Sequence, residues 1–385
     1  MFLTPEAPYP LEGGGALRSA SLLQYLACTH DVDVIVFRQP GAPDPVMQFP
    51  PGIARRVSRI DLPPTRATQL ARSVRNAVRL VRRVPPLVDR FSGFGAQITA
   101  AVAGQQYAVA VIEHFWCAPY WREIAPACAR TVLDLHNIES VLHARCAEAD
   151  RGAEAFGHRI FARAALRLEL ACLPHFSRIL TASESDAVLA RERAPQVQVT
   201  VYPNAIPFHP LPAAERDQAV VFSGNLEYHP NQSAVRFFRR HIWPLLRERW
   251  PRLVWRLVGK NPQAVRQWTA GDARIEVRGP VPNSIEELAR SQVAVAPILA
   301  GSGTRLKILE AWAAGLPVVS TRLGAEGLPV EDGRHLLLAD TGPGFAETVS
   351  RLLESRHLRE ELGTAGRQLL ESRFTWEKAW QTLQL

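Results

Sequence analysis

The stretch "GSGTRLKILEAWAAGLPVVST", residues 301–321, contains a glycine turn, a helical pattern and a run of β-branched residues. Gly301 and Gly303 let the backbone turn sharply and let a ligand approach closely. A helix that begins near Thr304 presents unpaired N–H groups and a partial positive charge. The final residues, "PVVST", predict a buried strand. This order of loop, helix and strand is typical of a parallel α/β sheet.

Arg305 and Lys307 place two cations in the first turn of this helix, where positive charge is unfavourable. Lysine is also scarce, with three residues against 42 arginines. A bound anion such as a diphosphate explains both cations. We therefore expect Ser302, Gly303 and Thr304 to bind the same group through their backbone.

Glu310 lies about 9 Å further along the helix axis than Thr304, at 1.5 Å per residue. This is roughly the separation of a diphosphate and a ribose, and a carboxylate accepts two hydrogen bonds from a ribose diol. The alternative is an ordinary helix with an exposed Lys307–Glu310 pair, which contributes a few tenths of a kcal/mol. The small residues of "AWAAG" favour a buried helix instead, in which a lone carboxylate is costly.

Strands alternate with helices on both sides of this segment, which predicts parallel sheets covered on both faces. A proline-rich linker at 202–212 divides the chain, and ligands of such sheets bind at the carboxyl ends of the strands. We expect two Rossmann-like, doubly wound α/β domains that face each other across a cleft. Their predicted strands are a stub at the N-terminus, 32–37, 107–113, 131–137, 178–183 and 199–204, then 219–224, 253–259, 275–279, 293–298 and 317–321. Predicted helices follow the glycines at 13–15 and span 141–173, 231–249, 262–269 and 284–291.

Length and composition are those of a globular protein. A chain of 385 residues exceeds one compact core, and 47% hydrophobic content excludes general disorder. No run of roughly 18 apolar residues predicts a membrane span, and no secretory signal is evident. The five cysteines include no C-x-x-C pair, which favours reduced thiols in the cytoplasm over disulfides or a zinc site.

The net charge of +8 is concentrated in residues 51–90, which hold ten arginines and two aspartates. Within "LARSVRNAVRLVRR" the apolar residues recur at near-helical spacing, and arginines fall on another face. This pattern is typical of a basic helix on an anionic membrane, and the alternative is a solvated surface helix. Nucleic acid is disfavoured because no aromatic residues interleave the arginines.

Three glycines, Gly13, Gly14 and Gly15, precede an expected helix whose first turn contains Arg18. We interpret them as a loop that touches the acceptor or a phosphate, against the alternative of a plain strand–helix turn. His114 follows a predicted strand at its carboxyl end, where its side chain can face a ligand. The alternative is that His114 is structural and packs against Phe115 and Trp116.

The stretch "DLHNIES" places Asp134, His136 and Glu139 around the end of the next strand. Side chains at the carboxyl end of a strand can face a bound ligand. These residue types also occur in metal sites, but we predict that no metal is bound here.

Several motifs resemble glycosyltransferases of the GT-B fold, specifically the retaining family called glycosyl transferases group 1, or family 4. The similar stretches are "GTRLKILEAWAAGLPVVST", "GAEGLPVEDGRHLLLAD", "RFTWEKAW", "YPNAIP", "ILTASESDA" and "PYPLEGGGALRS". The resemblance covers nearly the whole chain, and its C-terminal part is the most specific.

The resemblance implies a donor site marked by two glutamates with seven residues between them. The second matches Glu310, as the ribose ligand, and the first falls at Ser302, so it is missing. The stretch "SGNLEYHPNQSA" also lacks the family's usual arginine and lysine, which leaves Arg305 and Lys307 as the evident replacements. The expected donor-binding residues are Gly224, Asn225, Gly259, Lys260, Ser302, Gly303, Thr304 and Glu310.

The implied reaction is retaining transfer of a hexose from a UDP-, GDP- or dTDP-sugar to a glycan, lipid-linked or small-molecule acceptor, without a cofactor. Arg305, Lys307 and His114 are the expected catalytic residues, and His114 is expected to contact the transferring sugar. The expected acceptor-binding residues are Gly13, Gly14, Gly15, Arg18 and His136. The alternatives are a nucleotide-sugar 2-epimerase of the same fold and a non-catalytic sugar-binding or nucleotide-binding protein.

The expected domains are an acceptor domain at 1–205, a donor domain at 206–365 and a C-terminal helix at 366–385 that packs on the first domain. We expect a cytoplasmic enzyme of cell-surface polysaccharide or glycolipid synthesis, peripheral on the inner face of the membrane through residues 51–90.

Overall fold

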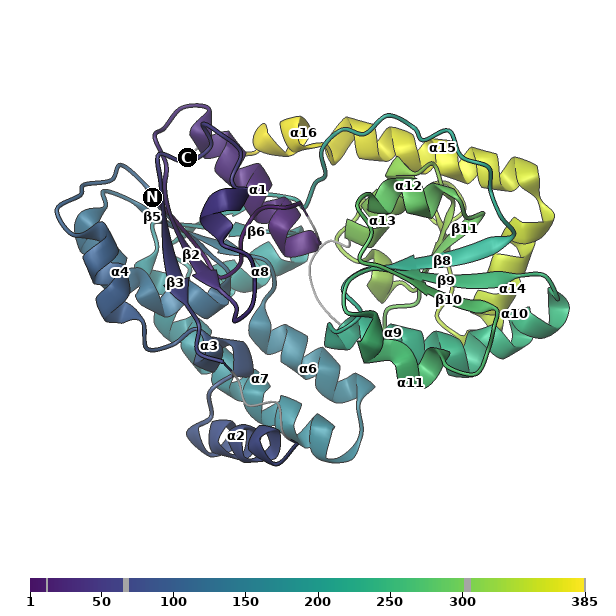
Figure 1. Ribbon diagram of the computed structural model, residues 1–385, viewed down its shortest axis with the longest axis horizontal. Helices are drawn as coiled ribbons and strands as arrows, with labels where there is room; N and C mark the ends of the chain where they lie inside the picture. Colours follow the sequence, from purple (N-terminus) through teal and green to yellow (C-terminus); the bar gives the residue numbers. More distant parts are fainter. Residues whose placement is uncertain (12, 65–68, 301–305, 384–385) are drawn as a thin grey trace. The chain divides into compact units, whose positions relative to one another are not determined.

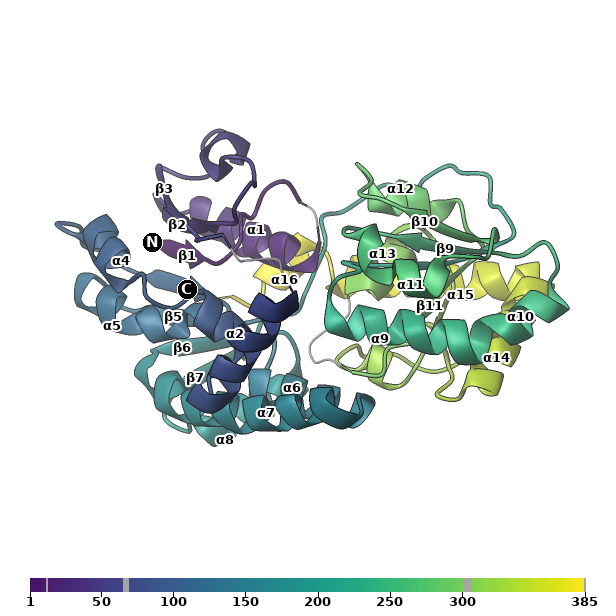
Figure 2. The ribbon, with the colours of Figure 1, turned by 60° about the horizontal axis from the view of Figure 1, so that its bottom comes forward.

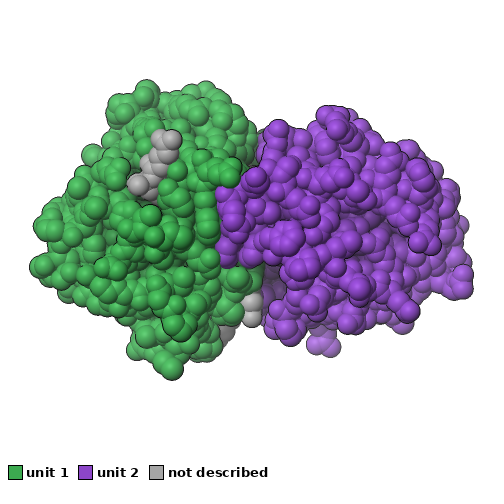
Figure 3. All heavy atoms as spheres, turned by 90° about the horizontal axis from the view of Figure 1, so that it is seen from above, with its two compact units in different colours: residues 1–203, 380–385 green, residues 204–379 purple. Residues whose placement is uncertain are grey.

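The computed structural model describes residues 1–11, 13–64, 69–300 and 306–383, and of 69–73 only the backbone. The chain forms two compact units, coloured separately in Figure 3. Unit 1 is Met1–Pro203 with Trp380–Leu385, and unit 2 is Asn204–Ala379. The boundary between the units therefore falls two residues before the expected one in the sequence. Most of the expected C-terminal helix belongs to unit 2.

Unit 1 contains a parallel sheet of seven strands in the order β3-β2-β1-β4-β5-β6-β7. Its strands are β1 (Phe2–Thr4), β2 (Asp33–Arg38), β3 (Arg56–Asp61), β4 (Ala110–Glu113), β5 (Thr131–Leu135), β6 (Arg178–Thr181) and β7 (Gln198–Val201). β3 lies inside the basic segment and was not predicted, because its sequence "RVSRID" shows no apolar run. It is an edge strand with a mostly exposed or half-exposed surface.

The first strand is the predicted stub, since β1 has only three residues. It nevertheless lies in the middle of the sheet, pairs with β2 and β4, and is fully buried. The Met1 amino group donates to the carbonyl of Val109 at 2.7 Å, which extends this attachment. Pairing on both sides compensates for the short length.

The helices of unit 1 are α1 (Gly14–Ala27), α2 (Gln69–Arg82), α3 (Pro86–Arg90), α4 (Gly95–Val102), α5 (Trp121–Ile124), α6 (Glu139–Ala149), α7 (Gly152–Cys172) and α8 (Glu184–Arg193). The prediction of one helix over 141–173 was wrong. Asp150 and Arg151 are extended, and Gly152 has a φ of 64°, so the chain ends α6 and begins α7 there. The two helices pack against each other (Figure 1).

Unit 2 contains a parallel sheet of six strands in the order β10-β9-β8-β11-β12-β13. Its strands are β8 (Ala219–Ser223), β9 (Val254–Val258), β10 (Ile275–Arg278), β11 (Val293–Ala296), β12 (Val318–Ser320) and the unpredicted two-residue β13 (Leu337–Leu338). The helices are α9 (His229–Phe237), α10 (Trp243–Arg249), α11 (Arg266–Thr269), α12 (Ser284–Ala289), α13 (Leu306–Ala313), α14 (Gly342–Glu354), α15 (Arg356–Arg373) and α16 (Trp376–Trp380). In Figure 1, α9 to α11 lie on one face of the sheet, and α12, α13 and α15 lie on the other.

The helix predicted over 231–249 continues through a π-helical turn, Phe238–Ile242, between α9 and α10. Pro244 follows directly as the second residue of α10. Proline has no N–H to donate, and the wider turn accommodates its missing hydrogen bond. Phe238, Ile242 and Trp243 stay fully buried through this irregularity.

The strand order reverses once in each sheet, between β1 and β4 in unit 1 and between β8 and β11 in unit 2. Crevices at such switch points are where open α/β sheets bind their ligands. His114 follows β4, and Gly224 follows β8. Both predicted sites thus lie at a switch point. No helix in the described part of the chain is long and apolar enough to cross a membrane.

Candidate functional site

Three glycines follow neighbouring strands of unit 2 and bring their backbones into close contact. Gly224, Gly259 and Gly279 follow β8, β9 and β10, with φ values of 142°, 155° and 133°. A Cβ on Gly259 would lie 1.8 Å from the carbonyl oxygen of Gly224, and one on Gly279 would lie 2.3 Å from that of Gly259. Only glycine fits these positions, which leaves the strand ends without side chains at the predicted donor site.

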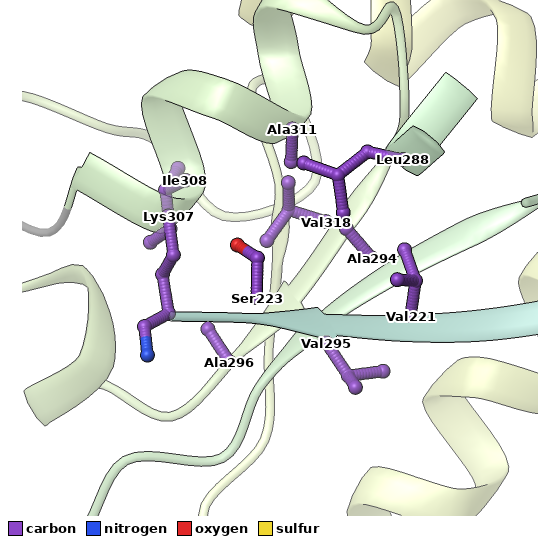
Figure 4. A pocket seen from close by; sticks show the side chains of 10 residues that line it. All are labelled: Val221, Ser223, Leu288, Ala294, Val295, Ala296, Lys307, Ile308, Ala311 and Val318. Carbon is purple, nitrogen blue, oxygen red and sulfur yellow. The ribbon is translucent and has the colours of Figure 1, made fainter. Parts of the chain in front are cut away.

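Lys307 reaches the first of these glycines from α13. Its Nζ donates to Oδ1 of Asn231 at 2.6 Å and lies 4.1 Å from the centre of the Phe222 ring. The same nitrogen is 3.4 Å from the point where a Cβ on Gly224 would sit. The loop after β8 has no lysine of its own, and Lys307 brings a cation to it from another element. Figure 4 shows Lys307 and Ser223 lining a small pocket at β8 and β11.

Glu310 lies one turn further along α13 and accepts from two serines. The hydroxyl of Ser223 donates to one carboxylate oxygen at 3.2 Å, and that of Ser284 donates to the other at 3.3 Å. Burial raises the pKa of Glu310, while the Ser223 bond and the charge of Lys307 lower it. Lys307 and Glu310 turn to different partners, so the alternative of a simple surface pair does not describe this helix.

The remaining donor-site predictions divide into two groups. Asn225 belongs to the loop after β8, where its carbonyl accepts from the Asn231 amide at 2.7 Å. Lys260 follows Gly259, and its carbonyl accepts from the backbone N–H of Leu226 at 3.0 Å. Four predicted residues lie outside the described part of the chain, namely Ser302, Gly303, Thr304 and Arg305.

Arg18 is buried inside unit 1, which differs from the acceptor role that the sequence suggested. Its guanidinium binds both carboxylate oxygens of Asp134, which lies on β5, and donates to the carbonyl of Tyr202 at 2.7 Å. Its side chain is 1% exposed. The positive charge therefore ties α1 to the sheet and is not presented to solvent.

A second buried pair lies beside this one. His136 Nε2 is 2.6 Å from Oε2 of Glu113 and 3.3 Å from Oδ2 of Asp134. Burial lowers the pKa of His136, but the two carboxylates outweigh burial and raise it. Arg18, Asp134, His136 and Glu113 thus form one buried hydrogen-bonded network, in which burial and the charge of Asp134 raise the pKa of Glu113.

His114 is neutral in this network. Burial and the charge of His136 hold the pKa of His114 well below its ordinary value. Its ring lies between those of Trp116 and His136, with centroids 4.2 and 3.5 Å away. A Cβ on Gly15 would be 3.7 Å from His114 Nε2, so the glycine loop lies beside this imidazole.

The other two glycines of that loop begin the helix. Gly13, with a φ of 95°, is the residue before α1, and Gly14 is its first residue. The structure thus brings the glycine loop and His114 together, and the ring of His136 lies against that of His114.

Ligand atoms of Glu113, His114 and His136 lie within 4.8 Å of one another, so their spacing suits a metal ion. The set fits a metal less well, because His136 Nε2 and the Glu113 carboxylate already bond to each other at 2.6 Å. The prediction of a metal-free site remains a prediction.

Glu139, at the start of α6, is also buried close to His114. Its carboxylate accepts from the indole N–H of Trp116 at 2.7 Å. Burial raises the pKa of Glu139 from 4.5 to about 7, and the nearby Glu169 adds to the rise. The folded protein therefore holds the Glu139 proton more tightly than the unfolded chain does. The stability that this group contributes to folding is fully present below pH 4.5 and is lost as the pH rises through about 7.

We expect Glu139→Gln to stabilise unit 1 at alkaline pH. The amide keeps an acceptor for Trp116 and removes the buried charge, so the gain is near zero at acid pH and about 3 kcal/mol at about pH 8. Thermal unfolding of both proteins across this pH range measures it. Glu148→Gln, an exposed change on the same helix, is the control. A gain that does not vary with pH would contradict the assignment.

Sequence reasoning missed three contributors. Glu113 ends β4 directly before His114, and this place at a strand end is a usable signal. Asn231 and Ser284 lie on α9 and α12, and nothing near them in the sequence marks them as partners of Lys307 and Glu310.

Part of the sequence is similar to known glycosyltransferases. The family described as glycosyl transferases group 1 matches residues 217–355. The chain is 38% identical over 72 residues to the lipopolysaccharide core biosynthesis glycosyltransferase LpsE of Rhizobium meliloti, which is 18% of this chain and 21% of that protein. It is 32% identical over 77 residues to spore coat protein SA of Bacillus subtilis, 19% of this chain and 20% of that protein. The aligned segments thus span about a fifth of these relatives.

Solved structures extend the similarity to the whole chain. Sucrose-phosphate synthase from Thermosynechococcus elongatus has a TM-score of 0.74 at 19% identity, covering 99% of this chain and 96% of its own. HepE of Anabaena, solved with UDP and glucose, has a TM-score of 0.66 at 15% identity over the same shares. The chain therefore has the GT-B fold of these solved structures, and its residues 217–355 match the family described as glycosyl transferases group 1.

Proposed function

We propose that the protein transfers a hexose from a nucleoside diphosphate sugar to a hydroxyl of a glycan, lipid-linked or small-molecule acceptor, with retention of the anomeric configuration. The observation that carries this proposal is the carboxylate of Glu310, which lies on the same helix as Lys307. This carboxylate accepts hydrogen bonds from Ser223 and Ser284, which belong to other elements. A buried carboxylate with two weakly held oxygens suits a ribose diol. The nucleotide is proposed to bind beside it, where the backbones of Gly224, Gly259 and Gly279 end three neighbouring strands.

Lys307 has the chemistry that the leaving group needs. In the proposed reaction the anomeric C–O bond breaks, and its electron pair goes to the departing diphosphate. The ammonium group stabilises that charge more strongly in the transition state than in the bound sugar nucleotide. The acceptor oxygen bonds to the anomeric carbon on the same face, and its proton passes to the leaving phosphate. Arg305 and the backbone of Gly303 and Thr304 are proposed to assist.

The acceptor is proposed to bind unit 1 at the glycine loop and His114. A neutral imidazole with a lone pair accepts a hydrogen bond from a sugar hydroxyl. Burial keeps the pKa of His114 low, and the neighbouring His136, bonded to Glu113, lowers it further.

UDP is the first nucleotide to test as the donor's carrier, because HepE was solved with UDP and glucose. The name of LpsE makes lipopolysaccharide-type glycans the first acceptors to test. We propose a role in the synthesis of cell-surface polysaccharide or glycolipid on this basis.

Binding of UDP, GDP, ADP, dTDP and their sugars, measured by calorimetry, tests the donor site. We expect one diphosphate to bind and Glu310→Ala to weaken it at least tenfold, because about 1.4 kcal/mol or more is lost with two charged hydrogen bonds. Glu248→Ala, an exposed change on α10, is the matched control. Binding of no nucleotide, or equal binding by the Glu310 variant, would overturn the proposal.

A nucleotide-sugar 2-epimerase is the second candidate, favoured by the carboxylates of Glu113 and Asp134 near His114. Arg18 and His136 lower the pKa of Asp134, which makes it a poor base, whereas burial raises the pKa of Glu113. Transfer remains the first proposal because Lys307 and Glu310 of α13 suit a departing diphosphate and a ribose. Incubation of the bound sugar nucleotide with and without an acceptor distinguishes the two. Epimerised or free sugar without any acceptor would favour the second candidate.

A further inference from the structure

The α2 helix leaves its apolar face uncovered. Val74, Val78 and Val81 recur at helical spacing, and their exposed fractions are 55%, 48% and 84%. Leu80, on another side of the helix, approaches α7 near Gly157. The helix therefore packs on α7 through one edge (Figures 1 and 2). Its three valines stay exposed.

The neighbouring face of α7 continues this surface. Phe156 is 60% exposed, and Ile160, Arg163 and Arg167 follow at the same helical spacing. The opposite face of α7 buries Phe161 and Ala165. We call the exposed set the α2–α7 surface; it consists of Val74, Val78, Val81, Arg83, Phe156, Ile160, Arg163 and Arg167.

A hollow of about 320 Å³ lies between the two helices, within the size range of small-molecule sites. Its walls combine apolar side chains with three guanidinium groups, and no acidic residue lines it. The lining residues are Leu80, Val81, Arg83, Ile160, Arg163, Ala164 and Arg167.

The charge of this hollow is not neutralised by the protein. Arg79 and Arg82, elsewhere on α2, pair with Asp89 at 2.8 and 3.2 Å. By contrast, within the described residues no ion pair or hydrogen bond involves the side chains of the three arginines in the hollow. Three unpaired guanidinium groups beside exposed aliphatic and aromatic side chains match a ligand with a phosphate and a hydrocarbon part.

We propose that the α2–α7 surface docks on an anionic membrane, with the hollow receiving the phosphate of an acidic phospholipid. The valines and Phe156 enter the boundary between head groups and acyl chains, and the arginines neutralise the lipid phosphate. The sequence pointed only to residues 51–90, whereas the structure adds the α7 residues and the hollow. The inference is independent of glycosyl transfer, because no residue of the surface belongs to the donor or acceptor site.

Co-sedimentation with phosphatidylcholine vesicles, with and without phosphatidylglycerol, measures the affinity of the full chain at about 0.15 M salt. We expect clear binding only to the acidic vesicles. A variant combining Arg83→Gln, Arg163→Gln and Arg167→Gln should bind about a hundredfold more weakly, since each arginine near the surface contributes about fivefold. The combined Val74→Ser, Val78→Ser and Val81→Ser variant should lose at least tenfold.

The matched control combines Arg252→Gln, Arg334→Gln and Arg356→Gln, which are exposed arginines of unit 2. It removes the same net charge from other surfaces and should bind within about threefold of wild type. Thermal midpoints and nucleotide titrations of all variants show whether each unit stays folded.

Three outcomes would overturn the proposal. The first is equal binding to neutral and acidic vesicles, or to neither. The second is the same loss in the control as in the hollow variant, which would reduce the effect to net charge. The third is saturable binding of inorganic phosphate that depends on the three arginines without vesicle binding, which would identify a free-anion site.

Discussion

Replacing Lys307 by methionine should lower kcat by about a hundredfold to a thousandfold, the loss typical of one group that stabilises developing negative charge. Methionine keeps most of the aliphatic contact with Phe222 and removes only the charge and the bond to Asn231. Nucleotide affinity should fall much less than kcat, because the lysine acts mainly on the charge that develops when the diphosphate leaves.

Steady-state kinetics with the donor identified by calorimetry measures this loss, and KM separates it from binding. Lys378→Met is the control, since Lys378 is an exposed lysine on α16. A Lys307→Met enzyme whose kcat stays within threefold of wild type would remove Lys307 from the catalytic machinery. The leaving-group role would then pass to residues in 301–305.

Replacing Arg18 by methionine should destabilise unit 1 by about 3–5 kcal/mol, the usual cost of breaking a buried ion pair by removing one partner. Asp134 would stay buried without its main cation and close to Glu113. In the intact protein burial raises the pKa of Asp134, but Arg18 and His136 outweigh burial and lower it. The stability from this pair is therefore present at neutral pH and is lost only as the pH falls through the lowered pKa.

Chemical or thermal unfolding of unit 1 at neutral pH measures the loss. Asp134→Asn in the Arg18→Met background should recover part of it, because no uncompensated charge remains. Arg356→Met removes an exposed arginine paired with Glu360 and should leave the unfolding midpoint unchanged. An Arg18→Met protein with wild-type stability and weak acceptor binding would restore the acceptor role that the sequence suggested.

The fold was predictable from local sequence. Alternating strands and helices, the proline-rich linker and the motifs of 301–321 predicted the two α/β units, and the topology confirms them. The unpredicted β3 has only a weak apolar pattern, because an edge strand of charged residues needs no buried face. The split at Asp150–Gly152 escaped notice because one positive-φ glycine decides it within an otherwise helical pattern.

The candidate site was predictable in part. The sequence singled out Lys307 and Glu310, because cations in a first turn and a carboxylate in a small-residue helix conflict with helix energetics unless a ligand explains them. It could not show that Arg18 is buried against Asp134, 116 residues away. An arginine near a glycine loop looks the same in sequence whether it faces solvent or a carboxylate.

By itself, the sequence determined the alternation of strands and helices, the division into two units and the residues that carry unusual charge, since periodicity and local chemistry are written in neighbouring residues. Only the tertiary structure decided which charges neutralise one another. It set Glu113 beside His136 and Lys307 beside Asn231, and among the described residues it gave Arg83, Arg163 and Arg167 of the α2–α7 surface no ion pair. Side-chain partners depend on distances between elements that are remote in the chain, and the packing of the whole unit sets those distances.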